Sequence, residues 1–86
     1  MYRIIILPNA LSSLSKIDKP IVERIVAKLN WLSENIKDTT LLPLRSNLSG
    51  FYKIRVGDWR VIYDVDHDKK EISVHKIGHR RDIYIS

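Results

Sequence analysis

Three cationic residues lie close together on either side of a short turn sequence. Lys53 and Arg55 precede Gly57-Asp58, and Arg60 follows it. Arginine and lysine bind phosphate, and the planar guanidinium of arginine matches two phosphate oxygens at once. Phe51 adds an aromatic ring at the start of the same stretch, and such rings stack against nucleic-acid bases. The grouping predicts a site that binds a nucleic-acid phosphate and stabilises negative charge on it.

A tight hairpin would bring these cations onto one surface. Gly57-Asp58 suits a two-residue type II′ turn, because glycine supplies the positive φ at its first position. Arg55 then faces Arg60, and side chains alternate between the two faces along each strand. The predicted core face carries Tyr52, Ile54, Val56, Trp59, Val61 and Tyr63, and the predicted open face carries Phe51, Lys53, Arg55, Arg60, Ile62 and Asp64. The alternative is two arginines that simply extend into water, at a cost of about 1 kcal/mol or less.

A second basic group comes near the C-terminus. It consists of Gly78, His79, Arg80 and Arg81, and Tyr84 follows three residues later. His79 and Arg81 are candidate RNA-binding residues, and the ring of Tyr84 can stack on a base. A tyrosine packed onto the core is an equally good reading of Tyr84. Arg80 or His79 could protonate a leaving oxygen, although an idle, solvated histidine fits as well.

The surrounding pattern predicts the elements that must position these residues. Asp18 is a candidate N-cap, with Pro20 in the first turn of a long helix. Apolar residues then recur every three or four positions, which indicates an amphipathic helix. The expected elements are a strand at Tyr2–Leu7, a short helix at Ala10–Ile17, the long helix through Ile36, an irregular loop at Lys37–Gly50, and strands at Phe51–Val56, Trp59–Val65 and Glu71–Ile77. This order, β-α-α-β-β-β, predicts one α+β domain: an N-terminal strand, a helical hairpin and an antiparallel meander, with the helices packed on one face of a twisted sheet.

Composition narrows the function classes. The 86 residues carry a formal net charge of +5 and contain no cysteine, so we expect a polyanionic partner and neither disulfides nor thiolate metal sites. We see no signal peptide and no apolar run long enough to cross a membrane, which is consistent with a cytoplasmic protein. The three histidines lack carboxylates at ligand spacing, so no metal site is predicted. We interpret His67 and His75 as structural.

Two motifs taken together resemble RelE-type toxins of the RelE/ParE toxin–antitoxin superfamily. They are FYKIRVGDWRVIY, residues 51–63, and GHRRDIY, residues 78–84, whose terminal tyrosines lie 21 positions apart. The opening strand, the DKP helix start and the SNLSG segment before the sheet also resemble the family. The resemblance therefore covers nearly the whole chain, and the paired motifs are more specific than either motif alone.

This resemblance implies an endoribonuclease that cleaves mRNA in the ribosomal A site without metal or cofactor. The RNA 2′-hydroxyl would attack the adjacent phosphate, giving a 2′,3′-cyclic phosphate and a free 5′-hydroxyl. The residues that match the family's catalytic positions are Lys53, Arg55, Arg60, Arg80 and Tyr84. Arg55 stands where some members have lysine, and the interval from Arg80 to Tyr84 is shorter than in well-known members.

The resemblance also implies binding partners, and it leaves two alternative functions open. The expected partners are a cognate antitoxin, which would form a hetero-oligomer with the chain, and the ribosome with its mRNA. Among the catalytic positions, Lys53 is the candidate base or proton relay because other cations crowd it. A ParE-like toxin that inhibits DNA gyrase by protein contact is one alternative. A binding homologue without activity is another.

Overall fold

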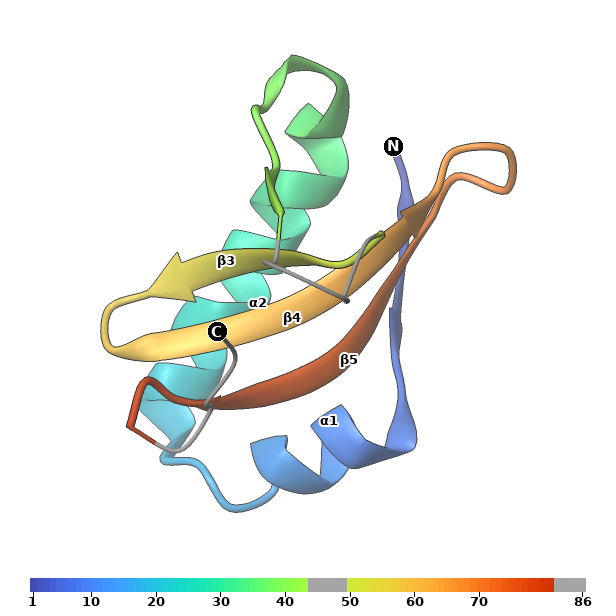
Figure 1. Cartoon of the computed structure of the whole chain (residues 1–86). Coiled ribbons are helices and arrows are strands. Elements are labelled where there is room, and N and C mark those ends of the chain that lie inside the picture. Colours follow the sequence, from blue (N-terminus) through green and yellow to red (C-terminus); the bar gives the residue numbers. More distant parts are fainter. Residues whose placement is uncertain (44–49, 82–86) are drawn as a thin grey trace.

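The predicted order of elements is confirmed in the computed structural model, which describes residues 1–43 and 50–81. Figure 1 shows a twisted sheet with a long helix behind it and a short helix beside its lower edge. The elements are β1 (Arg3–Ile6), α1 (Pro8–Leu14), α2 (Lys19–Asn35), a short 3-10 helix η1 (Ile36–Asp38), β2 (Leu42–Pro43), β3 (Tyr52–Val56), β4 (Trp59–Asp66) and β5 (Glu71–His79). The α+β fold class is therefore confirmed.

The sheet is mixed, with the strand order β1-β5-β4-β3-β2. Strands β3, β4 and β5 form the predicted antiparallel meander. Strand β1 adds to one edge parallel to β5, which the sequence pattern did not indicate because it assigns no neighbour to β1. Its N-terminal residue is held there by an ion pair in which the Arg3 guanidinium donates to the Glu71 carboxylate at 2.6 Å.

The loop predicted at Lys37–Gly50 contains more regular structure than expected. It opens with η1 and continues into β2, in which Leu42 and Pro43 pair with Lys53 and Tyr52. Proline cannot donate a backbone hydrogen bond, so it is tolerated on an edge strand such as this one. The prediction of an irregular loop was wrong for these residues, because two-residue strands have no sequence periodicity to detect. Residues 44–49 lie outside the described chain.

The helices begin close to where the sequence predicted. Asp18 is the N-cap residue of α2, in an extended conformation, although its side chain makes no capping hydrogen bond. The backbone carbonyl of Asp18 instead accepts from the N–H groups of Ile21 and Val22. Helix α1 begins at Pro8, two residues before the predicted start. Proline fits this first position because its missing N–H would have no helical partner there.

One apolar cluster fills the space between the helices and the sheet. The buried residues of the cluster are Tyr2, Ala10, Ile25, Leu29, Leu32, Ile36, Val56, Val61, Tyr63, Ile72, Val74 and Ile77. The predicted periodicity is confirmed by the burial of Ile25, Leu29 and Leu32 in α2 and of Ile36 in η1, whereas Trp31 remains 44% exposed. Burial raises the pKa of Tyr63 to about 12, with a smaller contribution from Tyr52. No helix in the described ranges is long and apolar enough to cross a membrane.

Candidate functional site

The hairpin between β3 and β4 has the predicted register. Gly57 has a φ of +60°, as the first position of a type II′ turn requires. Arg55 lies directly opposite Arg60, and Lys53 lies opposite Ile62. The predicted core face is also confirmed, because its six residues are either buried in the apolar cluster or packed against it. The basic residues therefore occupy the other face of the sheet, the one that Figure 1 presents to the viewer in front of α2.

Two neighbouring rows across the sheet make up the cationic part of this face. The first row runs from Arg55 through Arg60 to Gly78 on β5, and the second runs from Lys53 through Ile62 to Lys76. Lys76 is a fourth cation that the sequence analysis missed, because its position depends on the pairing of β5. In the described part of the chain, none of the four cations forms a salt bridge with a carboxylate.

The four cationic side chains differ in how deeply they are buried. Arg55 and Lys76 are exposed, whereas Lys53 and Arg60 are partly buried. Ile62, between them, is only 4% exposed, although it faces away from the main apolar cluster. Gly78 places no side chain beside Arg60. The four cations thus lie beside Ile62 on three neighbouring strands, and Asp64 follows two residues farther along β4 on the same face. Several positive charges grouped in this way suit a phosphate ligand.

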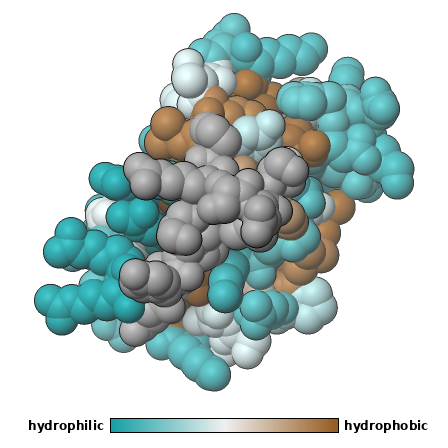
Figure 2. Space-filling model, viewed as in Figure 1, coloured by the Kyte–Doolittle hydropathy of each residue, from teal (hydrophilic) through white to brown (hydrophobic). Residues whose placement is uncertain are grey.

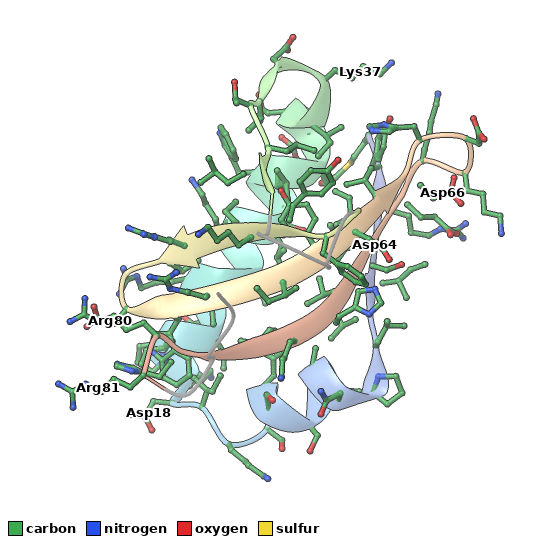
Figure 3. All side chains as sticks on the ribbon, viewed as in Figure 1. Asp18, Lys37, Asp64, Asp66, Arg80 and Arg81 are labelled. Atoms are coloured by element: carbon green, nitrogen blue, oxygen red, sulfur yellow. The ribbon has the colours of Figure 1, made fainter. Side chains whose placement is uncertain are left out.

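Arg80, which follows β5 in the chain, lies beside the turn between β3 and β4. Its backbone N–H donates to the carbonyl of Asp58 at 2.8 Å, and its Nε lies 3.8 Å from Asp58 Oδ1. These contacts fix Arg80 beside the hairpin turn. Figure 3 shows Arg80 and Arg81 pointing outward at the end of the sheet where this turn lies. Arg80 therefore extends the cationic surface, although its side chain is exposed.

Two other predicted residues are placed differently. His79 lies opposite Trp59, and their rings meet edge to face with centroids 5.5 Å apart. Trp59 packs against the main apolar cluster, so His79 is turned to the helix face of the sheet and not toward Arg60. Arg81 is exposed, and its backbone N–H donates to His79 Nδ1 at 3.2 Å. Tyr84 lies outside the described residues.

Phe51 contacts a histidine that is itself hydrogen-bonded to an aspartate, a grouping that the sequence pattern did not indicate. Its ring lies edge to face against His75, with centroids 4.9 Å apart. His75 in turn donates through Nε2 to Asp64 Oδ2 at 2.8 Å. A β-bulge creates this contact, because Ile62 pairs with Lys76 and the next residue of β4 pairs with Val74, which leaves His75 as the extra residue. Sequence alternation alone could not have revealed the bulge.

Charge is distributed unevenly along this face. Asp64 and Asp66 lie toward the β4–β5 turn, at the opposite end from Arg80 and Arg81 (Figure 3). Hydrophilic side chains also project from the margin of the molecule near the β3–β4 turn (Figure 2). A polar pocket at the acidic end is lined by Asp64, Asp66, His67, Asp68, Glu71 and Ser73, among others.

In residues 1–43 and 50–81, no three potential ligands are grouped so that they could hold a metal ion.

A groove between α2 and β3 continues the positive charge around the edge of the sheet. Arg24, Lys28 and Trp31 line it from α2, and Arg55 and Gly57 line it from the hairpin, around a volume of about 490 Å³. Lys28 Nζ lies 4.4 Å from the centre of the Trp31 ring. Arg55 therefore belongs both to this groove and to the cationic rows.

Comparison with known proteins agrees with the fold. The model of the family described as the ParE toxin of the type II toxin–antitoxin system parDE matches residues 4–84. Toxin RelG of Mycobacterium tuberculosis is 36% identical over 42 residues, which are 49% of this chain. The match spans about half the length (48%) of RelG.

Solved structures extend the similarity to almost the whole chain. A chain of the toxin–antitoxin complex RelBE2 from Mycobacterium tuberculosis has a TM-score of 0.81 at 25% identity, with 92% of this chain and 98% of that chain covered. The isolated RelE toxin of E. coli has a TM-score of 0.77 at 23% identity, with 92% and 84% covered, and supports the fold alone. The chain belongs to the ParE toxin family of type II toxin–antitoxin systems, as a RelE-type member of the RelE/ParE superfamily.

Proposed function

We propose that this toxin is a ribosome-dependent endoribonuclease that cleaves mRNA in the A site and so inhibits translation in the cytoplasm. The observation that carries the proposal is the set of four cations, Lys53, Arg55, Arg60 and Lys76, in two adjacent rows with no carboxylate among them. Like charges on a sheet face repel one another and do not stabilise the fold. A bound phosphate, in contrast, is stabilised by several positive charges.

The proposed reaction is attack of an RNA 2′-hydroxyl on the adjacent phosphate. Negative charge grows on the phosphoryl oxygens as the new P–O bond forms and the bond to the 5′-oxygen breaks. Arg55 and Arg60 stabilise that charge, because guanidinium groups stay protonated and offer paired donors. Lys53 contributes a further charge or relays a proton, and Arg80 assists at the leaving oxygen. Tyr84, Phe51, Arg81 and His79 are the proposed contacts to bases and flanking phosphates.

Among these proposed RNA contacts, His79 has the least support from the structure. Its ring packs against Trp59 on the helix face, so it could contact RNA only beyond the edge of the sheet. Arg80 has better support, because its backbone is bonded to the hairpin turn beside the cationic rows. The partly buried positions of Lys53 and Arg60 support their assignment to the centre of the site.

The proposed dependence on the ribosome is supported by the exposure of part of this cationic surface. Arg55 and Lys76 are exposed to solvent, and exposed side chains alone hold an RNA strand weakly in the orientation needed for attack. Fixing two reacting groups in the correct geometry supplies several kcal/mol of the activation barrier. We propose that the ribosome supplies this positioning.

The test compares cleavage of one mRNA in two settings. We expect the purified toxin to cut the mRNA on ribosomes programmed with it, and to cut the same RNA free in solution at least 100-fold more slowly. Equal rates on free and bound RNA would contradict ribosome dependence. A gyrase supercoiling assay is run beside it, because the matched family takes its name from ParE. Gyrase inhibition without RNA cleavage would establish the ParE-like alternative.

We further propose that a cognate antitoxin binds the toxin in a hetero-oligomer and inhibits it. The similar chain from Mycobacterium tuberculosis comes from a toxin–antitoxin complex. A net charge of +5 and the groove between α2 and β3 suit an acidic segment that folds on binding. The product of a neighbouring small gene should copurify with the toxin and abolish cleavage. Harmless overexpression of active toxin without such a partner would contradict the proposal.

A further inference from the structure

Asp64 and His75 form a carboxylate–imidazole pair on the face that carries the four cations. Nε2 of His75 and Oδ2 of Asp64 are 2.8 Å apart, and the two side chains are 34% and 38% exposed. An ionised carboxylate can only accept a hydrogen bond, so Nε2 carries the proton of the pair. In the neutral ring Nδ1 is then a proton acceptor, on a side chain that solvent can reach.

The bulge in β5 gives this pair its position. His75 is the extra residue between Val74, which is buried in the apolar cluster, and Lys76, which belongs to the cationic rows. Its bond to Asp64 places the ring one row beyond Lys53 and Lys76 on the same face. Asp64 and Arg60 lie two residues on either side of Ile62, so their Cα atoms are about 13 Å apart at the usual rise of an extended strand.

We propose that His75 is the general base of this ribonuclease and that Asp64 is its positioning residue; the inference rests on the function proposed above. The 2′-hydroxyl passes its proton to Nδ1 of His75, and the 2′-oxygen forms a bond to phosphorus. The bond from phosphorus to the 5′-oxygen breaks, and the 5′-oxygen leaves with a proton from solvent. His75 later returns its own proton to solvent, so the enzyme is unchanged.

A catalytic site built on the cationic rows needs a general base. Their lysine and arginine side chains donate hydrogen bonds when charged, and an attacking hydroxyl requires an acceptor. Histidine is the side chain that ordinarily accepts and releases protons near neutral pH. Asp64 fixes the orientation of the His75 ring and stabilises its charged form, and the rings of Phe51 and His75 pack edge to face. A nucleotide lying over Lys53 would be within reach of both Arg60 and His75.

The competing explanation is that the pair merely links β4 to β5, and one experiment separates the two. His75→Ala is measured in single-turnover cleavage on programmed ribosomes, with and without added imidazole, together with its thermal melt. We expect the rate to fall about 100-fold or more, the scale for losing a general base, and free imidazole to restore part of it. Asp64→Asn should lower the rate less, and imidazole should not restore it.

His67→Ala is the matched control. His67 is also hydrogen-bonded, through Nδ1 to the Tyr2 hydroxyl at 2.9 Å, but it lies in the β4–β5 turn and off the cationic rows. We expect this variant to cleave at the wild-type rate and not to respond to imidazole.

The outcomes distinguish the two proposals. A wild-type protein that leaves ribosome-bound mRNA intact overturns the nuclease function and the base together. Wild-type cleavage with an undiminished rate for His75→Ala overturns only the assignment of His75. A slow His75→Ala protein that imidazole cannot restore, and that melts at a lower temperature, identifies the pair as structural and also overturns the assignment.

Discussion

Replacing Arg60 with alanine should lower the single-turnover cleavage rate on programmed ribosomes by about 10²–10³-fold, the scale for losing one preorganised charge-stabilising contact. Arg60 is held on β4 by backbone pairs to Arg55 on one side and Gly78 on the other. Its side chain lies outside the apolar cluster. The variant should therefore keep its fold, and removing one of two opposed arginines even relieves repulsion.

Two further variants sharpen this test. Arg60→Lys should recover only part of the rate, because a point charge cannot reproduce the paired donors of a guanidinium. Arg3→Ala removes an arginine of the same sheet that lies on β1 and pairs with Glu71, so it should cleave normally. An Arg60→Ala protein with a normal melt and a wild-type rate would remove this residue from the mechanism.

The free energy of unfolding should decrease as the pH rises from about 10 to about 12, because of Tyr63. Burial holds the pKa of this phenol at about 12 in the folded protein, whereas the unfolded chain loses the proton near 10. Above pH 10 the unfolded state therefore binds fewer protons than the folded state, and stability declines until the folded pKa is passed. A shift of this size corresponds to about 2–3 kcal/mol.

Denaturant unfolding of Tyr63→Phe across the same pH range isolates this contribution. Phenylalanine fills nearly the same volume in the apolar cluster but has no proton to lose, so the variant should retain more of its stability at pH 12 than the wild type. Lysines and arginines ionise similarly in both proteins and cancel in the difference. Tyr52→Phe should reduce the dependence only slightly, since Tyr52 is the smaller cause of the shift. Parallel pH profiles for wild type and Tyr63→Phe would contradict the prediction.

The parts of the fold that follow from local rules were predictable from sequence. Gly57-Asp58 determined the hairpin register, and with it the opposition of Arg55 and Arg60. The helical repeat identified the buried face of α2. The parallel pairing of β1 with β5 was not predictable in the same way, because it joins residues at opposite ends of the chain. No local pattern encodes such a contact.

The candidate site was predictable where one hairpin supplies it and not where a third strand contributes. Lys53, Arg55 and Arg60 belong to β3 and β4, and their common face follows from alternation. Lys76 joins them only through the pairing of β4 with β5, and His75 meets Asp64 only because a bulge shifts that pairing. His79 was expected near the phosphate, but the same alternation along β5 turns it toward Trp59.

The edge position of β1 has a consequence for when the sheet and the candidate site are completed during synthesis. Arg3 and Glu71 contact each other across a separation of 68 residues, so β1 cannot pair its backbone groups with β5 until β5 has been synthesised. Contacts between such distant parts of a chain are slow to form. The cationic rows also require β5, because it supplies Lys76 and Gly78. A chain synthesised only as far as β4 thus lacks both the finished sheet and the complete set of four cations, so the proposed site is complete only after β5 has been translated.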